Sequence, residues 1–191
     1  MKEQDPDTVS DQTLMISVRD GNVEKLGMLF ERHHVQLFNF FLHLTENRHL
    51  SEDLVQEVFV RLLKYRYTYR EKSMFTSWMF QIARNVRIDY LRKSPHDEVS
   101  MGNDPHEHVS PMPTPGEQTE ESEKKQIMQI ALSQLPEEKR EILLLRGVHG
   151  LKLEEIAEIL KCSVSTIKSR VYRAIQDLRV AVNKLEGMNG Q

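Results

Sequence analysis

The sequence predicts an all-α protein made of two small helical domains joined by a flexible linker. Apolar residues recur at helical spacing in residues 10–93 and again in residues 121–185. The stretch between them, residues 94–120, contains five prolines and has no apolar period, which is typical of a linker. No stretch combines the alternating side-chain pattern of a β-strand with a second such stretch nearby that could pair with it. These observations favour two separate helical cores.

The charges fall into blocks, although the net charge of the 191 residues is only −3. Residues 61–93 carry nine Lys/Arg against two Asp/Glu, and residues 152–184 carry seven against four. Residues 1–60 and 94–126 are acidic. Two basic blocks separated by an acidic one suggest two anion-binding faces. Charge alone is equally consistent with ordinary solvated helix faces.

Composition excludes several classes of protein. No apolar run approaches the roughly 20 residues of a membrane span, and the polar start Met-Lys-Glu-Gln-Asp-Pro does not suggest a secretory signal. Cys162 is the only cysteine, which rules out an internal disulfide. A phosphate-cradling glycine loop and a nucleophile motif are both missing, so an enzyme is not expected. We expect a cytoplasmic protein with no cofactor, no metal and no direct membrane insertion.

Three helix starts are expected in the first half of the chain, at residues with good N-capping side chains. Ser10 is expected to cap a short helix that runs through Arg19, Asn22 to cap a long apolar helix, and Ser51 to cap the next. The long helix carries His33 and His34, which point about 100° apart. We expect them in surface or packing roles, because such a pair cannot easily share one metal ion.

The helix after Ser51 buries a stripe of Leu54, Val55, Val58, Phe59 and Leu62, and leaves Asp53, Gln56 and Glu57 on outer faces. A loop follows in which Tyr65, Tyr67 and Tyr69 alternate with Arg66, Thr68 and Arg70. Aromatic faces for base stacking beside cations for phosphates are typical of single-strand binding, although at least one tyrosine is expected to cap the core.

The next helix is expected to bury Phe75, Trp78, Met79, Ile82, Val86 and Tyr90. Arg84, Asn85, Arg87 and Arg92 are expected on its other faces. Arg84 and Arg87 are three residues apart, so both could reach one phosphate backbone. An asparagine such as Asn85 can offer a base edge a donor and an acceptor together.

The C-terminal stretch indicates a helix-turn-helix: residues 153–160, a turn at Lys161 and Cys162, and a second helix capped by Ser163. A seam of Val164, Ile167, Val171, Ala174 and Leu178 is expected to be buried. The outward residues are hydroxyls and cations, which suit major-groove edges and phosphates. They are Ser165, Thr166, Lys168, Ser169, Arg170, Tyr172 and Arg173.

Three motifs, D-L-V-Q-E-V-F, I-A-R-N and S-T-I-K-S-R-V-Y-R-A, together resemble the extracytoplasmic-function (ECF) subfamily of bacterial RNA polymerase sigma factors. The resemblance implies a sigma region 2-like four-helix domain over residues 10–93 and a sigma region 4-like helix-turn-helix domain over residues 121–185. Two residues depart from the pattern. Lys152 stands where a capping Ser or Thr is usual, and Lys161 stands where glycine is common.

The resemblance also implies the partners: RNA polymerase core, promoter DNA and an anti-sigma factor. Polymerase contacts would come from Asp53, Gln56 and Glu57. The downstream promoter element, with an unstacked base, would be bound by Tyr67, Tyr69, Arg84, Asn85 and Arg87. The upstream element would be bound by Thr166, Lys168, Ser169, Arg170, Tyr172 and Arg173. The implied function is to direct polymerase core to promoters and to assist promoter melting.

One rival hypothesis is a stand-alone helix-turn-helix regulator whose N-terminal half senses a signal or dimerises. It predicts tight duplex binding without polymerase and leaves the loop of tyrosines and arginines unexplained. The linker favours the sigma factor. As a flexible coil it averages only about 30 Å, whereas the two elements lie about 60 Å apart at ~3.4 Å per base pair. Something larger would have to hold it extended.

Overall fold

The computed structural model describes residues 9–93 and 120–189, and within these ranges all regular structure is helical. The chain divides into two compact units, Met1–Asp104 and Pro105–Gln191. The first holds α1 (Asp11–Arg19), α2 (Lys25–Thr45), α3 (Arg48–Lys64), the short 3-10 helix η2 (Arg66–Thr68) and α4 (Phe75–Lys93). The second holds α5 (Glu120–Ser133), α6 (Glu137–Leu143), the π-helical turn η4 (Leu144–Val148), α7 (Leu153–Leu160) and α8 (Val164–Asn189). The all-α prediction, with four α-helices in the first unit, is confirmed.

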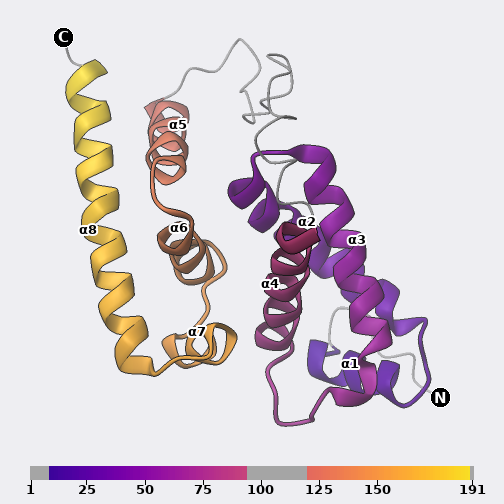
Figure 1. The fold of residues 1–191 in the computed structure, drawn as a ribbon. Helices are drawn as coiled ribbons and strands as arrows, with labels where there is room; N and C mark the ends of the chain where they lie inside the picture. The colour runs from indigo at the N-terminus through magenta and orange to yellow at the C-terminus, as the bar shows by residue number, and fades with distance from the viewer. Residues whose placement is uncertain (1–8, 94–119, 190–191) are drawn as a thin grey trace. The chain divides into compact units, whose positions relative to one another are not determined.

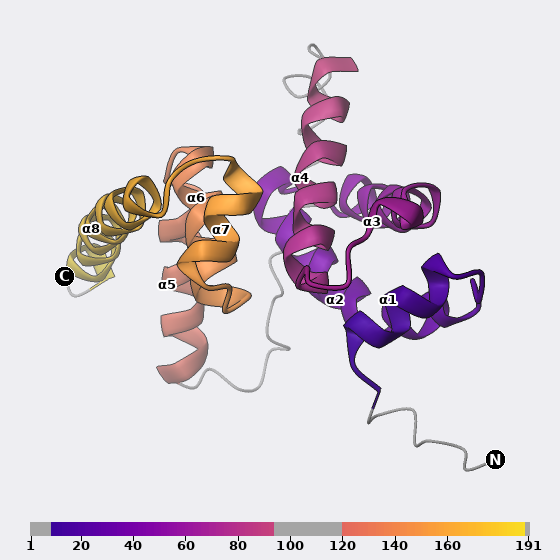
Figure 2. The ribbon, with the colours of Figure 1, turned by 90° about the horizontal axis from the view of Figure 1, so that it is seen from below.

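The N-terminal unit is built around α2, which packs against α1 on one side and α3 on another, while α4 packs on α3 (Figures 1 and 2). Aromatic rings fill its core. Phe40 meets Phe80 of α4 edge to face at 5.2 Å between ring centroids. Burial of such large side chains is the main source of stability in a unit of this size.

The N-cap predictions have mixed outcomes. Ser10 caps α1 as expected, since its side chain accepts a hydrogen bond from the Thr13 amide at 3.2 Å. The predictions for Asn22 and Ser51 are wrong. The α2 helix begins at Lys25 without a side-chain cap. The cap of α3 is Asn47, whose Oδ1 accepts from the Leu50 amide at 2.9 Å.

Ser51 lies inside α3 and is fully buried. Its hydroxyl donates to the backbone oxygen of Asn47 at 2.6 Å and lies 3.0 Å from the hydroxyl of Thr45. The residue therefore ties the first turn of α3 to the end of α2. A buried serine with satisfied bonds tolerates a helix interior, which is why α3 starts one turn earlier than predicted.

In the C-terminal unit, α8 runs alongside α5 and α6 and also packs on α7 (Figure 1). On α5 and just after it, Ala131, Leu132 and Leu135 are buried, whereas Ile130 is 41% exposed and lies on the other side of the helix. Of the seam predicted on α8, Ile167 and Ala174 are completely buried, whereas Val164, Val171 and Leu178 are half-buried. The expected linker, residues 94–120, lies outside the described residues except for Glu120, which begins α5.

The turn between α7 and α8 contains a strained residue. Lys161 has φ +52°, a left-handed conformation that favours glycine. Replacing Lys161 with glycine is expected to stabilise the C-terminal unit by about 0.5–1 kcal/mol, because the Cβ strain is relieved. Lys184 is the matched control: it is exposed within α8, so the same change there should destabilise by about 1 kcal/mol. Urea unfolding of both variants checks this; a loss at position 161 would contradict it.

Candidate functional sites

The first candidate surface is the exposed face of the second helix of the helix-turn-helix. As predicted, α7 spans Leu153–Leu160, and the Thr166 amide donates to the Ser163 hydroxyl at 3.1 Å, so Ser163 caps α8. The side chains opposite the buried seam are exposed: Ser165, Lys168, Ser169, Arg170, Tyr172 and Arg173. Thr166 is half-buried, with its hydroxyl 2.8 Å from that of Ser163. The result is a cationic, hydroxyl-rich strip along the start of α8.

The start of α7 shows how the chain compensates for Lys152. Its backbone amide donates to the Glu155 carboxylate at 2.7 Å, which satisfies one of the amides left unpaired at a helix start. The same bond places negative charge at the positive end of the helix dipole. Glu155 therefore does part of the work that a capping Ser or Thr would do.

The second candidate surface is the tyrosine loop, defined here as residues 65–74 between α3 and α4. Tyr67 is 68% exposed. The Arg66 guanidinium lies 4.2 Å from the centroid of the Tyr67 ring, and it donates to the Tyr67 hydroxyl at 2.7 Å. A flat aromatic side chain backed by a cation is thus held at the surface, an arrangement that suits base stacking.

Tyr69 is different, because only 2% of it is exposed. Its ring packs 5.0 Å from Trp78 and 6.4 Å from Phe75, and its hydroxyl donates to the Ser73 backbone oxygen at 2.8 Å. Burial, with a smaller contribution from the charge of Asp11, raises the pKa of Tyr69 to about 12, so the phenol keeps its proton. In this conformation Tyr69 offers no face to a base. A direct contact of Tyr69 with DNA stays a prediction, and in this structure the ring packs inside the loop.

The third candidate surface is on α4, where Asn85 is exposed and Arg84 is half-buried. Arg87 was expected on an outer face but is only 6% exposed. The reason is that the buried face of α4 is wider than its apolar pattern suggests. Phe80 and Ala83 are buried, and Arg87 continues their i, i+3, i+7 row. Trp78 and Tyr90, expected to be buried, are half-buried.

On α3, Asp53 and Gln56 are exposed and point away from the core. Glu57 is half-exposed and accepts from Arg61 Nε at 2.7 Å. Arg61 also pairs with Asp89 of α4 at 2.5 Å, and this hydrogen bond lowers the pKa of the Asp89 carboxyl. The three predicted residues therefore form one polar strip, in which Glu57 is held in place by a bridge between α3 and α4.

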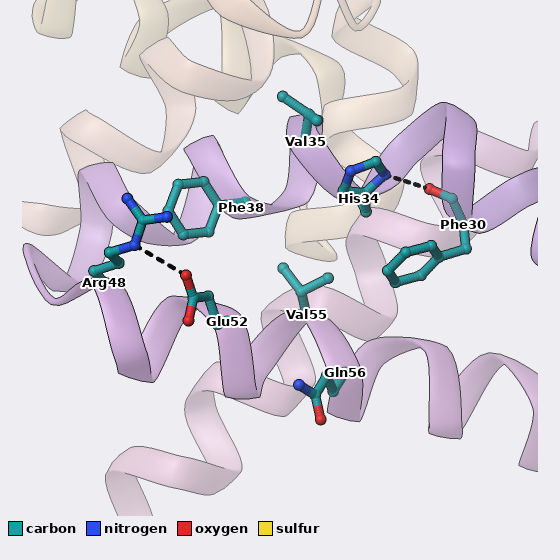
Figure 3. Close-up of a pocket in the computed structure, with 8 residues that line it drawn as sticks. All are labelled: Phe30, His34, Val35, Phe38, Arg48, Glu52, Val55 and Gln56. Carbon is teal, nitrogen blue, oxygen red and sulfur yellow. Dashed lines mark hydrogen bonds and ion pairs between the residues drawn. The ribbon is translucent and has the colours of Figure 1, made fainter. Parts of the chain in front are cut away.

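Beside this strip lies a groove between α2 and α3 with a volume of about 350 Å³ (Figure 3). Phe30, His34 and Phe38 line it from α2; Arg48, Glu52 and Gln56 line it from α3. Arg48 lies 5.6 Å from the centroid of the Phe38 ring and pairs with Glu52 at 3.0 Å. Sequence reasoning missed this groove. The signal was the i, i+4, i+8 spacing of Phe30, His34 and Phe38, a second aromatic row on α2.

The part of the chain that the structure describes holds no group of three or more His, Cys, Asp or Glu side chains that could bind a metal ion. His33 is buried, as a packing role predicts, and its Nε2 lies 2.7 Å from Asp11. The two closely spaced histidines of the expected linker, His106 and His108, lie outside the described residues. No described helix is both long and apolar enough to cross a membrane.

Sequence models of two protein families match the chain: Sigma-70 region 2 over residues 29–95 and Sigma-70, region 4 over residues 125–178. The ECF RNA polymerase sigma factor SigM of Bacillus subtilis is 32% identical over 165 residues, covering 85% of this chain and 97% of the relative. The ECF RNA polymerase sigma-E factor of Haemophilus influenzae is 28% identical over 174 residues, covering 87% and 92%.

Solved structures agree with this result. The sigma factor RpoE from Bartonella quintana, in complex with the anti-sigma factor NepR, matches with a TM-score of 0.66 and 27% identity, covering 82% of this chain and 96% of that one. CnrH, in complex with the cytosolic domain of CnrY, matches with a TM-score of 0.68 and 21% identity, covering 91% and 97%. The second likeness shows the shared fold.

A region 2 domain followed by a helix-turn-helix region 4 domain defines an RNA polymerase sigma factor of the sigma-70 class. Such proteins bind the polymerase core and promoter DNA and initiate transcription without being enzymes themselves. Within that class, the chain belongs to the ECF sigma factors.

Proposed function

We propose that α3 carries the polymerase-binding surface, with Asp53 and Gln56 in direct contact and Glu57 at its edge. The observation that supports this is the exposure of an acidic and amide strip next to an open groove of about 350 Å³. Protein interfaces commonly combine an apolar pocket with a polar rim. The groove between α2 and α3 would receive apolar side chains of the polymerase core. Asp53 and Gln56 would bind polar groups beside it and so set the position of the polymerase along α3.

The strip along α8 binds the upstream promoter element in this proposal. Lys168, Ser169, Tyr172 and Arg173 face the major groove, and Arg170 lies nearer the phosphate backbone. Thr166, bonded to Ser163, orients the start of the helix and contributes a hydroxyl. Arginine and lysine can donate to guanine edges, and the helix start favours nearby phosphates. Residues 121–185 form this domain, and residues 94–120 link it to the domain of residues 10–93.

The downstream element is bound by the tyrosine loop together with α4. Tyr67 stacks on an unpaired base, Asn85 bonds to a base edge, and Arg84 binds phosphate. Tyr69 and Arg87, being buried in this structure, hold the loop and α4 in shape. Capture of an extruded base stabilises the opened strand, because the base exchanges its stacking in the duplex for stacking on protein.

Replacement of Tyr67 with alanine tests base capture. Base stacking on an aromatic side chain is worth about 1–3 kcal/mol, so open-complex formation on a cognate duplex promoter should fall about fivefold to a hundredfold. Tyr65 is the matched control, since it is 42% exposed in the same loop and is given no DNA contact. Permanganate reactivity of unpaired thymines provides the measurement. Equal losses for Tyr67→Ala and Tyr65→Ala would contradict the assignment.

Three further features complete the proposal. The chain carries out no catalysis of its own, and it works in the cytoplasm, where polymerase and DNA are. An anti-sigma factor binds it, by analogy with the Bartonella quintana protein solved with NepR. The single observation that carries the proposal is that each unit presents one surface suited to DNA: exposed Tyr67 backed by Arg66 in the first unit, and the cationic strip of α8 in the second. Run-off transcription with core polymerase, wild type against Asn85→Ala and Arg173→Ala, tests it; equal yields would overturn the assigned sites.

A further inference from the structure

The short helix α1 makes contact with the tyrosine loop as well as with α2 and α4. Its apolar side, Leu14, Met15 and Val18, is completely buried and accounts for its packing. Its polar side makes a separate set of bonds that do not contribute to that core. These bonds lead to two places: the middle of α2 and the far end of the tyrosine loop.

On the α2 side, α1 is anchored by Asp11. Its carboxylate lies 2.7 Å from His33 and 2.7 Å from Arg32, and these hydrogen bonds, above all the one with His33, lower the pKa of Asp11 despite partial burial. The His33 ring lies 5.2 Å from Phe75, the first residue of α4. Phe75 in turn packs on Tyr69. The anchor therefore fixes α1 relative to the buried half of the loop.

On the loop side, Arg19 at the end of α1 pairs with its neighbour Asp20 at 2.8 Å and, through Nη2, with Glu71 at 3.1 Å. Gln12 lies 3.4 Å from the sulfur of Met74. Glu71 and Met74 lie in the last part of the loop, between Tyr69 and the start of α4. Two sets of contacts thus hold the loop: the buried Tyr69, through its hydrogen bond to Ser73, and the side chains of α1.

We propose that α1 positions the tyrosine loop for base capture, with Arg19 acting on the loop through Glu71. The inference rests on the proposed role of Tyr67. Arg19 itself contacts no DNA. It limits the conformations open to residues 70–74, and this keeps the Tyr67 ring exposed where a base can stack on it. An exposed ion pair contributes little to global stability, so its loss should affect the loop more than the fold.

The test is a charge swap in open-complex formation by reconstituted holoenzyme on a duplex promoter. Arg19→Glu and Glu71→Arg are each expected to slow the step about fivefold, and the double variant Arg19→Glu/Glu71→Arg to recover to within twofold of wild type. Lys25→Glu, a charge reversal on α2, is the matched control. Melting temperature and polymerase affinity should stay unchanged in all four. Failure of the double variant to recover, or a parallel fall in polymerase affinity, would overturn the proposal.

A second arm separates this inference from the proposed function. If Arg19 acts through the loop, Arg19→Glu should add less than a twofold effect in a Tyr67→Ala background, because coupled residues are not additive. If the loss in the double variant Arg19→Glu/Tyr67→Ala equals the product of the two single losses, the positioning role is overturned. If Tyr67→Ala is impaired while Arg19→Glu equals wild type, only the inference fails. If Tyr67→Ala equals wild type, base capture fails and the inference fails with it.

Discussion

Replacement of Arg173 with alanine is expected to lower run-off transcription from a cognate promoter by about fivefold to a hundredfold. One arginine contact to a base edge contributes about 1–3 kcal/mol of discrimination. Arg173 is exposed on α8, and its helix is fixed by the fully buried Ile167 and Ala174, so removing the side chain should leave the fold intact. The loss should therefore appear in promoter recognition and not in thermal stability.

Arg179→Ala is the matched control for that experiment. Arg179 is also an exposed arginine of α8, but it lies almost two turns further along the helix and is assigned no contact. Its variant should transcribe like wild type. A promoter series with single base changes in the upstream element adds a second readout, since Arg173→Ala should relax discrimination at one position. Equal transcription by the two variants would remove Arg173 from the reading face.

Reversal of charge at Asp53 is expected to weaken binding to polymerase core by about thirtyfold or more. Residues at the centre of an interface commonly contribute 2 kcal/mol or more, and like charges placed together add a further cost. Asp53 is exposed on α3, so Asp53→Lys should unfold at the same temperature as wild type. Fluorescence anisotropy of labelled protein with purified core gives the affinity directly.

Glu31→Lys makes the same charge reversal at an exposed position of α2 and serves as control. It should bind core like wild type. If Asp53→Lys and Glu31→Lys lose affinity for core equally, the loss comes from long-range charge, and α3 does not carry the polymerase-binding surface. A Gln56→Ala variant distinguishes further, because it changes no charge and removes only the amide beside the groove. Unchanged binding by both Asp53→Lys and Gln56→Ala would contradict the proposed surface.

Local sequence signals predicted the helix-turn-helix well. The bounds of α7 and the Ser163 cap follow from apolar spacing and from a capping residue next to a turn, and both depend on neighbours a few residues away. The α3 start was predicted one turn late, because Asn47 and Ser51 are both good caps. Only the packing of the α2–α3 corner, which buries Ser51, decides between them.

The parts of the candidate sites that sequence could not predict depend on contacts between helices. Alternation of three tyrosines does not say which one turns inward; the neighbours Phe75 and Trp78 bury Tyr69 and leave Tyr67 exposed. The prediction that Arg87 lies on an outer face was wrong, because the width of the buried face of a helix depends on how many neighbouring helices pack on it. The groove beside Gln56 exists only where two helices meet.

The most direct measurement is promoter binding and run-off transcription by the purified chain, with and without polymerase core, on the same duplex. A sigma factor of this kind should give specific run-off and protection of both promoter elements only in the presence of core, with weak, salt-sensitive binding by the chain alone. Tight, sequence-specific duplex binding by the chain alone, with no stimulation of core, would contradict it and favour a stand-alone helix-turn-helix regulator.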